Sequence, residues 1–306
     1  MPNTANELNK ARTDKKDEFY TQYEDIEKEM IHYKNYFKNK KVYVNCDNPK
    51  TSQFYAYFYN EFKNLELSEL VSTYWVKEGK SILTITKDGD NIEQTELKGD
   101  GDFRSDECKE ILNKIDIVIT NPPFSLFRDL ITLLRDTYKD FIILGNINAV
   151  TTNVVWDMIK NKELWLGKSI HCGDRKFTVP DDYPLEASGC GIDENGKKYV
   201  RVKGVRWFTN ILADDTNDST LELTNLYNKE KYPTYENYDA IEVSKTKDIP
   251  YNYDGYMGVP ITFLDKYNSN QFEIIDMDKN LTENHKRFYL NGKQLYARIV
   301  IKRKCL

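Results

Sequence analysis

The sequence predicts an α/β protein built on a doubly wound, mostly parallel sheet, with a smaller C-terminal lobe. Short apolar runs rich in β-branched residues alternate with segments whose apolar residues recur at helical spacing. The clearest buried strand is Ile115–Thr120, which ends abruptly at Asn121-Pro122-Pro123-Phe124. After about residue 163 the runs become shorter, so we expect residues 1–210 to form the core domain and residues 211–306 the second lobe.

Helices and strands alternate through the first part of the chain. Apolar residues at helical spacing predict a helix over 22–38, and the run 41–45 predicts a strand that Asp47-Asn48-Pro49 closes. An aromatic-rich helix and another strand follow, and then two strand-like runs flank Lys87-Asp88-Gly89-Asp90, a typical hairpin turn. The elements expected here are a helix over 52–65 and strands over 70–75, 81–86 and 91–97.

The alternation continues and then changes character. The strand 115–120 lies between helices expected over 105–112 and 126–138, and a strand over 141–146 and a helix over 153–161 follow. Beyond them we expect short strands over 164–167, 176–179, 206–209 and 258–264. The core domain is expected to end near Asn210, and the remainder of the chain is rich in Tyr, Asn and charged residues.

Composition predicts a globular protein of one or two domains. The 306 residues are 40% hydrophobic and 30% charged, with no run long enough to span a bilayer and a polar N-terminus without a signal-peptide core. The five cysteines show no CxxC spacing and the three histidines are dispersed, so we expect neither disulfides nor a metal site. A cytoplasmic protein that does not enter membranes is the expectation.

Charge is unevenly distributed along the chain. Residues 279–306 carry a net charge of +7, whereas the whole chain carries −5 and the remainder therefore −12. The run Lys302-Arg303-Lys304 is the densest part of this basic segment. It is a candidate phosphate-contacting surface, and a solvated tail is an equally good interpretation of the charge alone.

The tetrapeptide Asn121-Pro122-Pro123-Phe124 has the groups needed to bind an aromatic amine. In open α/β sheets ligands bind at the loops that follow the carboxyl ends of strands, and the two prolines make this loop stiff. The Asn121 side-chain carbonyl and the Pro122 backbone carbonyl can accept two hydrogen bonds from an exocyclic amine while Phe124 stacks on its ring. Taken alone, the tetrapeptide is as typical of a plain turn after a strand.

The tetrapeptide resembles motif IV of the amino-methyltransferases that use S-adenosylmethionine. Three further segments precede it in order, and the ordered set closely resembles the EcoRI-type adenine-specific modification methylases from about Asp17 to Ile301. The preceding segments are Asp17-Glu18-Phe19-Tyr20-Thr21, Asn45-Cys46-Asp47-Asn48-Pro49 and Gly101-Asp102-Phe103-Arg104-Ser105. Three later ones complete the set: Ile143-Leu144-Gly145-Asn146, Trp207-Phe208-Thr209-Asn210 and 257–264.

The resemblance implies a role for each segment. Asn121, Pro122 and Phe124 would hold the target base, and Asn121 would also touch the cofactor. The other implied cofactor contacts are Tyr20 and Thr21 at the methionine end, Cys46, Asp47 and Pro49 in place of the usual Gly-rich loop, and Asp102 and Phe103 at the adenine. Taken singly, these residues would more often be caps, turns or core. No acid follows the strand 70–75, so the ribose contact has no candidate.

The implied activity is site-specific methylation of adenine N6 in double-stranded DNA, with S-adenosylmethionine as cofactor and the adenine flipped out of the duplex. A GAATTC-like site, a monomeric enzyme, a separate cognate restriction endonuclease and a C-terminal target-recognition lobe are implied in the same way. Other substrates remain open, namely RNA adenine, DNA cytosine N4 or a protein glutamine. A catalytically silent DNA-binding protein is the alternative from another class.

Overall fold

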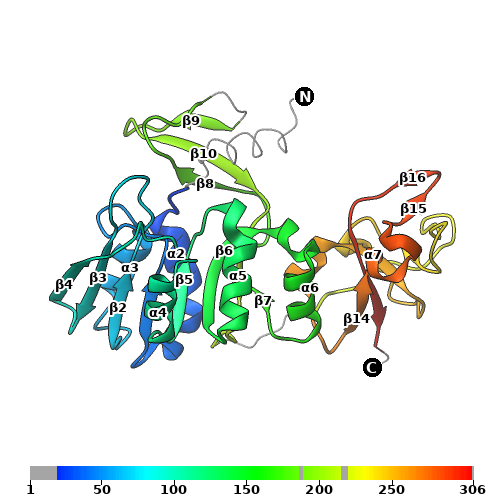
Figure 1. Ribbon diagram of the computed structural model, residues 1–306. Coiled ribbons are helices and arrows are strands. Elements are labelled where there is room, and N and C mark those ends of the chain that lie inside the picture. The colour runs from blue at the N-terminus through cyan, green and yellow to red at the C-terminus, as the bar shows by residue number, and fades with distance from the viewer. Residues whose placement is uncertain (1–18, 186–188, 215–219, 305–306) are drawn as a thin grey trace. The chain divides into compact units, whose positions relative to one another are not determined.

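The computed structural model describes residues 19–185, 189–214 and 220–304 (Figure 1). These residues form two compact units. The first contains the described residues up to Ala149 and from Leu164 to 214, and the second contains Val150–Glu163 and the described residues from 220 on.

The first unit is built on an eight-stranded sheet with the order β4-β3-β2-β1-β5-β6-β11-β7. Its four central strands run parallel, whereas the strands on either side pair antiparallel. The central strands are β2 (Glu69–Ser72), β1 (Lys41–Val44), β5 (Ile117–Thr120) and β6 (Asp140–Asn146); the outer strands are β3 (Ile82–Lys87), β4 (Asn91–Glu96), β11 (Val205–Thr209) and β7 (Trp165–Leu166). The predicted α/β class is confirmed, with a mixed sheet around a parallel centre.

Helices pack on both faces of this sheet. Successive side chains of a strand point to opposite faces, so Trp207 packs in the cluster under one helical layer while Phe208 contacts Phe127 of the other, with ring centroids 4.9 Å apart. The first layer is α2 (Tyr23–Met30), η1 (Ile31–Phe37) and α3 (Gln53–Asn60); the second contains α4 (Asp106–Asn113) and α5 (Phe127–Asp136).

Serine caps fix the starts of two helices where the sequence predicts them. Ser52 Oγ accepts a hydrogen bond from the Tyr55 amide at 3.1 Å, and Ser105 Oγ accepts one from the Cys108 amide at 3.2 Å. The helix predicted over 22–38 is only partly correct. It is α-helical to Met30 and then continues as a 3-10 segment.

The strand order creates a switch point between β1 and β5. The chain leaves β1 through α3 and returns on one side as β2, whereas it leaves β5 through α5 and returns on the other side as β6. The connections that follow the adjacent strands β1 and β5 therefore run in opposite directions. This opens a crevice between them at the carboxyl edge of the sheet.

A separate three-stranded antiparallel sheet also belongs to the first unit (Figure 1). It has the order β8-β10-β9, and β8 corresponds to the strand predicted over 176–179. The sheet consists of β8 (Asp174–Thr178), β10 (Lys198–Lys203) and β9 (Cys190–Ile192). The last two strands were not predicted.

The second unit has a four-stranded sheet of its own, with the order β12-β13-β17-β14. Helix α6 joins this unit, because the Trp156 indole and the Lys160 ammonium both bind the Asp276 carboxylate at 2.7 Å. The elements are α6 (Asn153–Lys160), β12 (Ile241–Glu242), β13 (Met257–Pro260), β14 (Phe272–Met277), α7 (Asp278–Leu281), the hairpin β15 (Tyr289–Leu290) and β16 (Lys293–Gln294), and β17 (Arg298–Arg303). Short 3-10 segments complete both units: η2 (Phe124–Leu126), η3 (Ile147–Thr151), η4 (Thr246–Asp248), η5 (Ile261–Lys266) and η6 (Glu283–His285).

Two expectations for the C-terminal region are corrected. The strand predicted over 258–264 ends at Pro260, which has no N–H to continue the ladder, and the chain turns into η5. The alternative of a solvated tail does not hold up to Arg303, because Lys302 and Arg303 lie in β17 and pair with Glu273 and Phe272 of β14. The apolar run Ile299–Ile301 before them is fully buried.

Candidate active site

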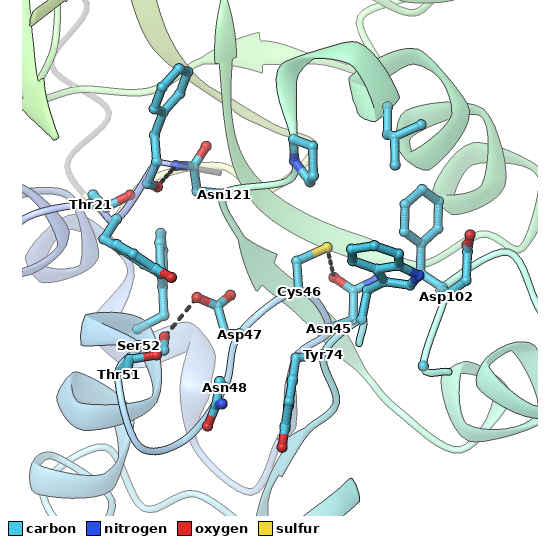
Figure 2. Close-up of a pocket in the computed structure, with 18 of the residues that line it drawn as sticks. Thr21, Asn45, Cys46, Asp47, Asn48, Thr51, Ser52, Tyr74, Asp102 and Asn121 are labelled. Carbon is cyan, nitrogen blue, oxygen red and sulfur yellow. Dashed lines mark hydrogen bonds between the residues drawn. The ribbon is translucent and has the colours of Figure 1, made fainter. Parts of the chain in front are cut away.

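A cavity of about 620 Å³ lies at the switch point, within the first unit (Figure 2). Its walls come from the segment before α2, the loops after β1, β2 and β5, and the loop before α4. Of the predicted site residues it contains Tyr20, Thr21, Cys46, Asp47, Asp102, Phe103 and Asn121. Pro49, Pro122 and Phe124 are not among its lining residues.

The Asn121 amide is bonded at one end only. Its Nδ2 donates to the Phe19 backbone carbonyl at 2.7 Å (Figure 2). Its Oδ1 is buried and has no hydrogen-bond partner among the described residues. Because buried acceptors are almost always satisfied, an acceptor left open beside a cavity points to a donor on a ligand. Thr21 Oγ1, which belongs to the same cavity wall, is also buried and has no hydrogen-bond partner among the described residues.

Phe124 is fixed by aromatic contacts. Its ring meets Phe19 and Phe177 edge-on, with centroids 5.6 and 6.4 Å away, and it is partly buried. Pro122 is buried and Pro123 lines the cavity. The loop is thus packed against neighbouring residues, and Phe124 lies outside the wall of the main cavity.

Asp47 places a carboxylate without a counter-ion in the cavity wall. One carboxylate oxygen accepts from Ser52 Oγ and the other from Thr120 Oγ1, both at 2.7 Å. No cation pairs with it within the described part of the chain. Burial raises the pKa of Asp47 to about 6, and the two hydroxyl donors only partly oppose that shift. Such a group suits a positively charged part of a ligand.

The rest of the loop after β1 is polar. Cys46 Sγ lies 3.6 Å from Asn45 Oδ1, to which it donates, and both residues line the cavity with Asn48. Pro49 follows without lining it. Four of the five residues of the predicted segment 45–49 thus line the cavity.

Asp102 is already engaged by an arginine. Arg104 binds its two carboxylate oxygens through Nε at 3.0 Å and Nη2 at 2.6 Å, and the Arg104 amide donates to Oδ1 at 2.9 Å. Arg104 also reaches Asp129 at 3.4 Å. A ligand donor would have to bind this carboxylate alongside Arg104, and Phe103 next to it is almost fully buried.

The loop after β2 supplies lining residues for which the sequence indicated no role. Tyr74 and Trp75 line the cavity, and the Trp75 indole donates to Asp100 Oδ2 at 3.0 Å. Gly101 lets the two loops meet, since it has φ +82° and a Cβ there would lie 2.2 Å from the Tyr74 carbonyl oxygen. Tyr74 and Trp75 could have been predicted from their position alone. They follow a strand next to β1, and residues at the carboxyl ends of such strands reach the crevice.

The basic residues predicted to touch DNA lie in the second unit. Lys302 Nζ lies 5.9 Å from the centre of the Tyr256 ring, and Arg303 is 4.0 Å from Asp254. Within the described ranges, no cluster of His, Cys, Asp or Glu could hold a metal ion. No helix described here is long and apolar enough to cross a membrane.

The fold and the cavity define a class of enzyme. A methyl transfer to an amine needs acceptors aimed at that amine beside a cofactor cavity, and a doubly wound sheet provides both at its switch point. The open acceptor of the Asn-Pro-Pro-Phe loop stands at that point, which is the arrangement of an amino-methyltransferase.

Comparison with known proteins gives the family. The protein-family model described as adenine-specific methyltransferase EcoRI matches residues 7–304 of this chain. Type II methyltransferase M.EcoRI of Escherichia coli is 44% identical over 318 aligned positions, which cover 98% of this chain and 97% of that protein. Type II methyltransferases M.MgeORF184P of Mycoplasma genitalium and M.MpnI of Mycoplasma pneumoniae are each 37% identical, over 97% of this chain and 98% of theirs.

No solved structure matches the chain at a comparable level of significance. The chain belongs to the EcoRI-type family of adenine-specific methyltransferases. The resemblance seen in the sequence is thereby confirmed.

Proposed function

We propose that this enzyme methylates adenine N6 at specific sites in double-stranded DNA, with S-adenosylmethionine as methyl donor and the target adenine flipped out of the duplex. The observation that carries the proposal is the buried, unpartnered Oδ1 of Asn121 in the cavity wall. Membership of the adenine-specific family and the likeness to Type II methyltransferases support the substrate.

The cavity residues fit a cationic, nucleoside-containing cofactor. When bound, S-adenosylmethionine supplies an electrophilic methyl group on a sulfonium. The Asp47 carboxylate lacks a counter-ion within the described structure and would face the positively charged methionine portion. Tyr20, Thr21 and Cys46 line the same cavity and would bind that portion too, with Pro49 shaping the loop.

Asp102 and Phe103, which also line the cavity, suit the adenine of the cofactor. Phe103 would contact the ring, and Asp102 would accept from its amino group beside Arg104.

The catalytic contribution of the chain is alignment. The lone pair of an adenine amine is delocalised into the ring, so the amine is a poor nucleophile. Asn121 Oδ1 and the Pro122 carbonyl would accept its two hydrogens, which favours a tetrahedral nitrogen and directs its lone pair at the methyl group. The nitrogen loses its proton only after attack, so no general base is needed beforehand. Extrusion of the base costs a few kcal/mol, and stacking on Phe124 offsets about 1–3 kcal/mol of it.

The second unit would serve as the target-recognition lobe. Lys302, Arg303 and Lys304 would contact phosphates, because their charges lie at the end of β17 on an otherwise acidic chain. We further propose a GAATTC-like target, a monomeric enzyme, and action beside a separate restriction endonuclease in the cytoplasm.

Transfer of labelled methyl from S-adenosylmethionine tests this function. The purified protein is incubated with duplex DNA, RNA or protein, and the DNA is digested to nucleosides. Label in N6-methyldeoxyadenosine is expected. Label in cytosine, in RNA or in protein would show that the enzyme acts on that substrate instead of DNA adenine. Tight DNA binding without transfer would support a catalytically silent DNA-binding protein.

A further inference from the structure

One residue contacts both side chains proposed to hold the target base. The Phe19 carbonyl accepts from Asn121 Nδ2 at 2.7 Å, and the Phe19 ring meets the Phe124 ring edge-on at 5.6 Å. Phe19 is only 7% exposed, so its position is set by packing. The segment Phe19–Gln22, called the strap below, therefore sets the rotation of the amide and the place of the ring together.

The strap is held in turn by β8. Tyr20 and Thr178 exchange two backbone hydrogen bonds, at 2.9 and 3.1 Å. Gln22 Nε2 donates to Thr178 Oγ1 at 3.0 Å, and Phe177 packs against Phe19 with ring centroids 5.8 Å apart. Strand β8 belongs to the three-stranded sheet, whereas Asn121 follows β5 of the eight-stranded sheet. The strap thus joins the smaller sheet to the catalytic loop.

The strap decides which end of the amide faces the cavity. An asparagine amide can rotate by half a turn, which exchanges its oxygen and nitrogen. A backbone carbonyl only accepts, so Phe19 selects the orientation with Nδ2 toward the strap and Oδ1 toward the ligand. In the opposite orientation an NH₂ group would face the amine of the target base, and two donors would oppose each other.

We propose that the strap, anchored by Gln22 to Thr178 of β8, is a positioning element that holds Asn121 in its accepting orientation during methyl transfer. The proposal rests on the catalytic role proposed for Asn121. Gln22 and Thr178 act through Asn121 and touch no reacting atom. Tyr20 and Thr21 of the strap would also contact the cofactor. Loss of the Gln22–Thr178 bond should therefore slow transfer at saturating substrates much more than it weakens cofactor binding, because the backbone bonds of Tyr20 to Thr178 remain.

Thr178→Val and Thr178→Ser form the matched test, since both change the side chain and only serine keeps the hydroxyl that accepts from Gln22. We expect the single-turnover rate at saturating DNA and S-adenosylmethionine to fall about tenfold in Thr178→Val and to recover within about threefold in Thr178→Ser. The dissociation constant for S-adenosylmethionine, from calorimetry, should stay within about twofold. Gln22→Leu removes the same bond from the strap side and should repeat the result. It also replaces Thr178→Val should that variant not fold.

Thr95→Val is the control, because it makes the same change on the exposed edge strand β4. Equal rates for Thr178→Val and Thr178→Ser, or a Gln22→Leu variant with the wild-type rate, would overturn the proposal. So would a loss of cofactor affinity in proportion to the loss of rate. Asn121→Ala in the same series separates the two claims. Activity in that variant refutes the catalytic role itself, whereas its inactivity beside fully active strap variants refutes only the strap.

Discussion

At the scale of single residues, Asp47 shows how a ligand site is kept at the expense of stability. Its pKa is raised to about 6 by burial, whereas a carboxyl in an unfolded chain titrates near ~3.9. The folded protein therefore binds the proton more tightly, so stability decreases as the pH rises from about 4 to about 6. Above that range the folded protein carries a partly buried charge to which Ser52 and Thr120 donate hydrogen bonds.

Asp47→Asn should stabilise the cofactor-free protein at about pH 8, by at most about 3 kcal/mol. At about pH 4 the gain should largely vanish, since the wild-type carboxyl is then protonated in the folded protein. The same variant should bind S-adenosylmethionine more weakly at neutral pH because it lacks the negative charge. Urea denaturation at both pH values and calorimetry measure these effects. An equal change in stability at both pH values would mean that the charge is not its cause.

Asp102→Ala should weaken S-adenosylmethionine binding more than it lowers the rate at saturating cofactor. A ligand donor left without its acceptor costs about 1–3 kcal/mol. Asp136→Ala is a suitable control, because it removes the carboxylate partner of another arginine, Arg135, and Asp136 does not line the cavity. If calorimetry gives wild-type affinity for Asp102→Ala, then Asp102 serves only to bind Arg104.

At the scale of elements, the capped start of α4 supports the cavity wall at 101–104. Ser105→Ala removes the cap bond to the Cys108 amide and should lower the free energy of unfolding by about 1 kcal/mol. Ser105→Asp keeps a capping oxygen and should restore most of it. Equilibrium denaturation of both variants tests the cap, and equal stability of the two would show that Ser105 does not act through the capping bond.

The sequence predicted those elements whose signals are local. The helix starts near Ser52 and Ser105, the apolar strand before Asn121 and the end of that strand at the two prolines depend on neighbouring residues and were predicted correctly. The strands β9 and β10 exist through pairing with β8, and that long-range contact leaves little trace in their composition. For the same reason nothing local showed that α6 joins the second unit.

The candidate site was predictable to a similar degree. Motif positions gave Asn121, Asp47 and Asp102, which all line the cavity. The engagement of Asp102 by Arg104 and the bond from Asn121 to Phe19 depend on side-chain geometry, which a linear motif does not contain. Phe124 was also predicted from the motif, but it does not line the cavity. Its ring packs against Phe19 instead.

At the scale of the whole molecule, part of the positive charge of residues 279–306 is neutralised by ion pairs within the second unit. Arg298 pairs with Glu242 at 2.7 Å, and Arg287 pairs with the buried Asp278 at 2.6 Å. Both are therefore structural, and the excess of +7 in the sequence overstates the charge that a polyanion could meet. Lys302, Arg303 and Lys304 remain the best candidates for phosphate contacts.

Replacement of Lys302, Arg303 and Lys304 by glutamine should weaken binding to all duplexes alike. Each lost phosphate contact should reduce the slope of log affinity against log salt concentration by up to about 0.9. The control replaces three surface lysines that pair with carboxylates in the first unit, namely Lys38, Lys63 and Lys80. Titrations of cognate and non-cognate duplexes over a salt series decide, and an unchanged slope would place the phosphate contacts elsewhere.

We propose that the open oxygen of Asn121 orients the amine of a flipped adenine for methyl transfer. The most direct test of this proposal is the single-turnover rate of Asn121→Ala on duplex DNA, read as N6-methyldeoxyadenosine, together with cofactor affinity. We expect transfer to be nearly abolished while S-adenosylmethionine binds within a few-fold of wild type, because the lost interaction acts mainly in the transition state. A variant that keeps more than about a tenth of the wild-type rate, a barrier change below ~1.4 kcal/mol, would contradict it.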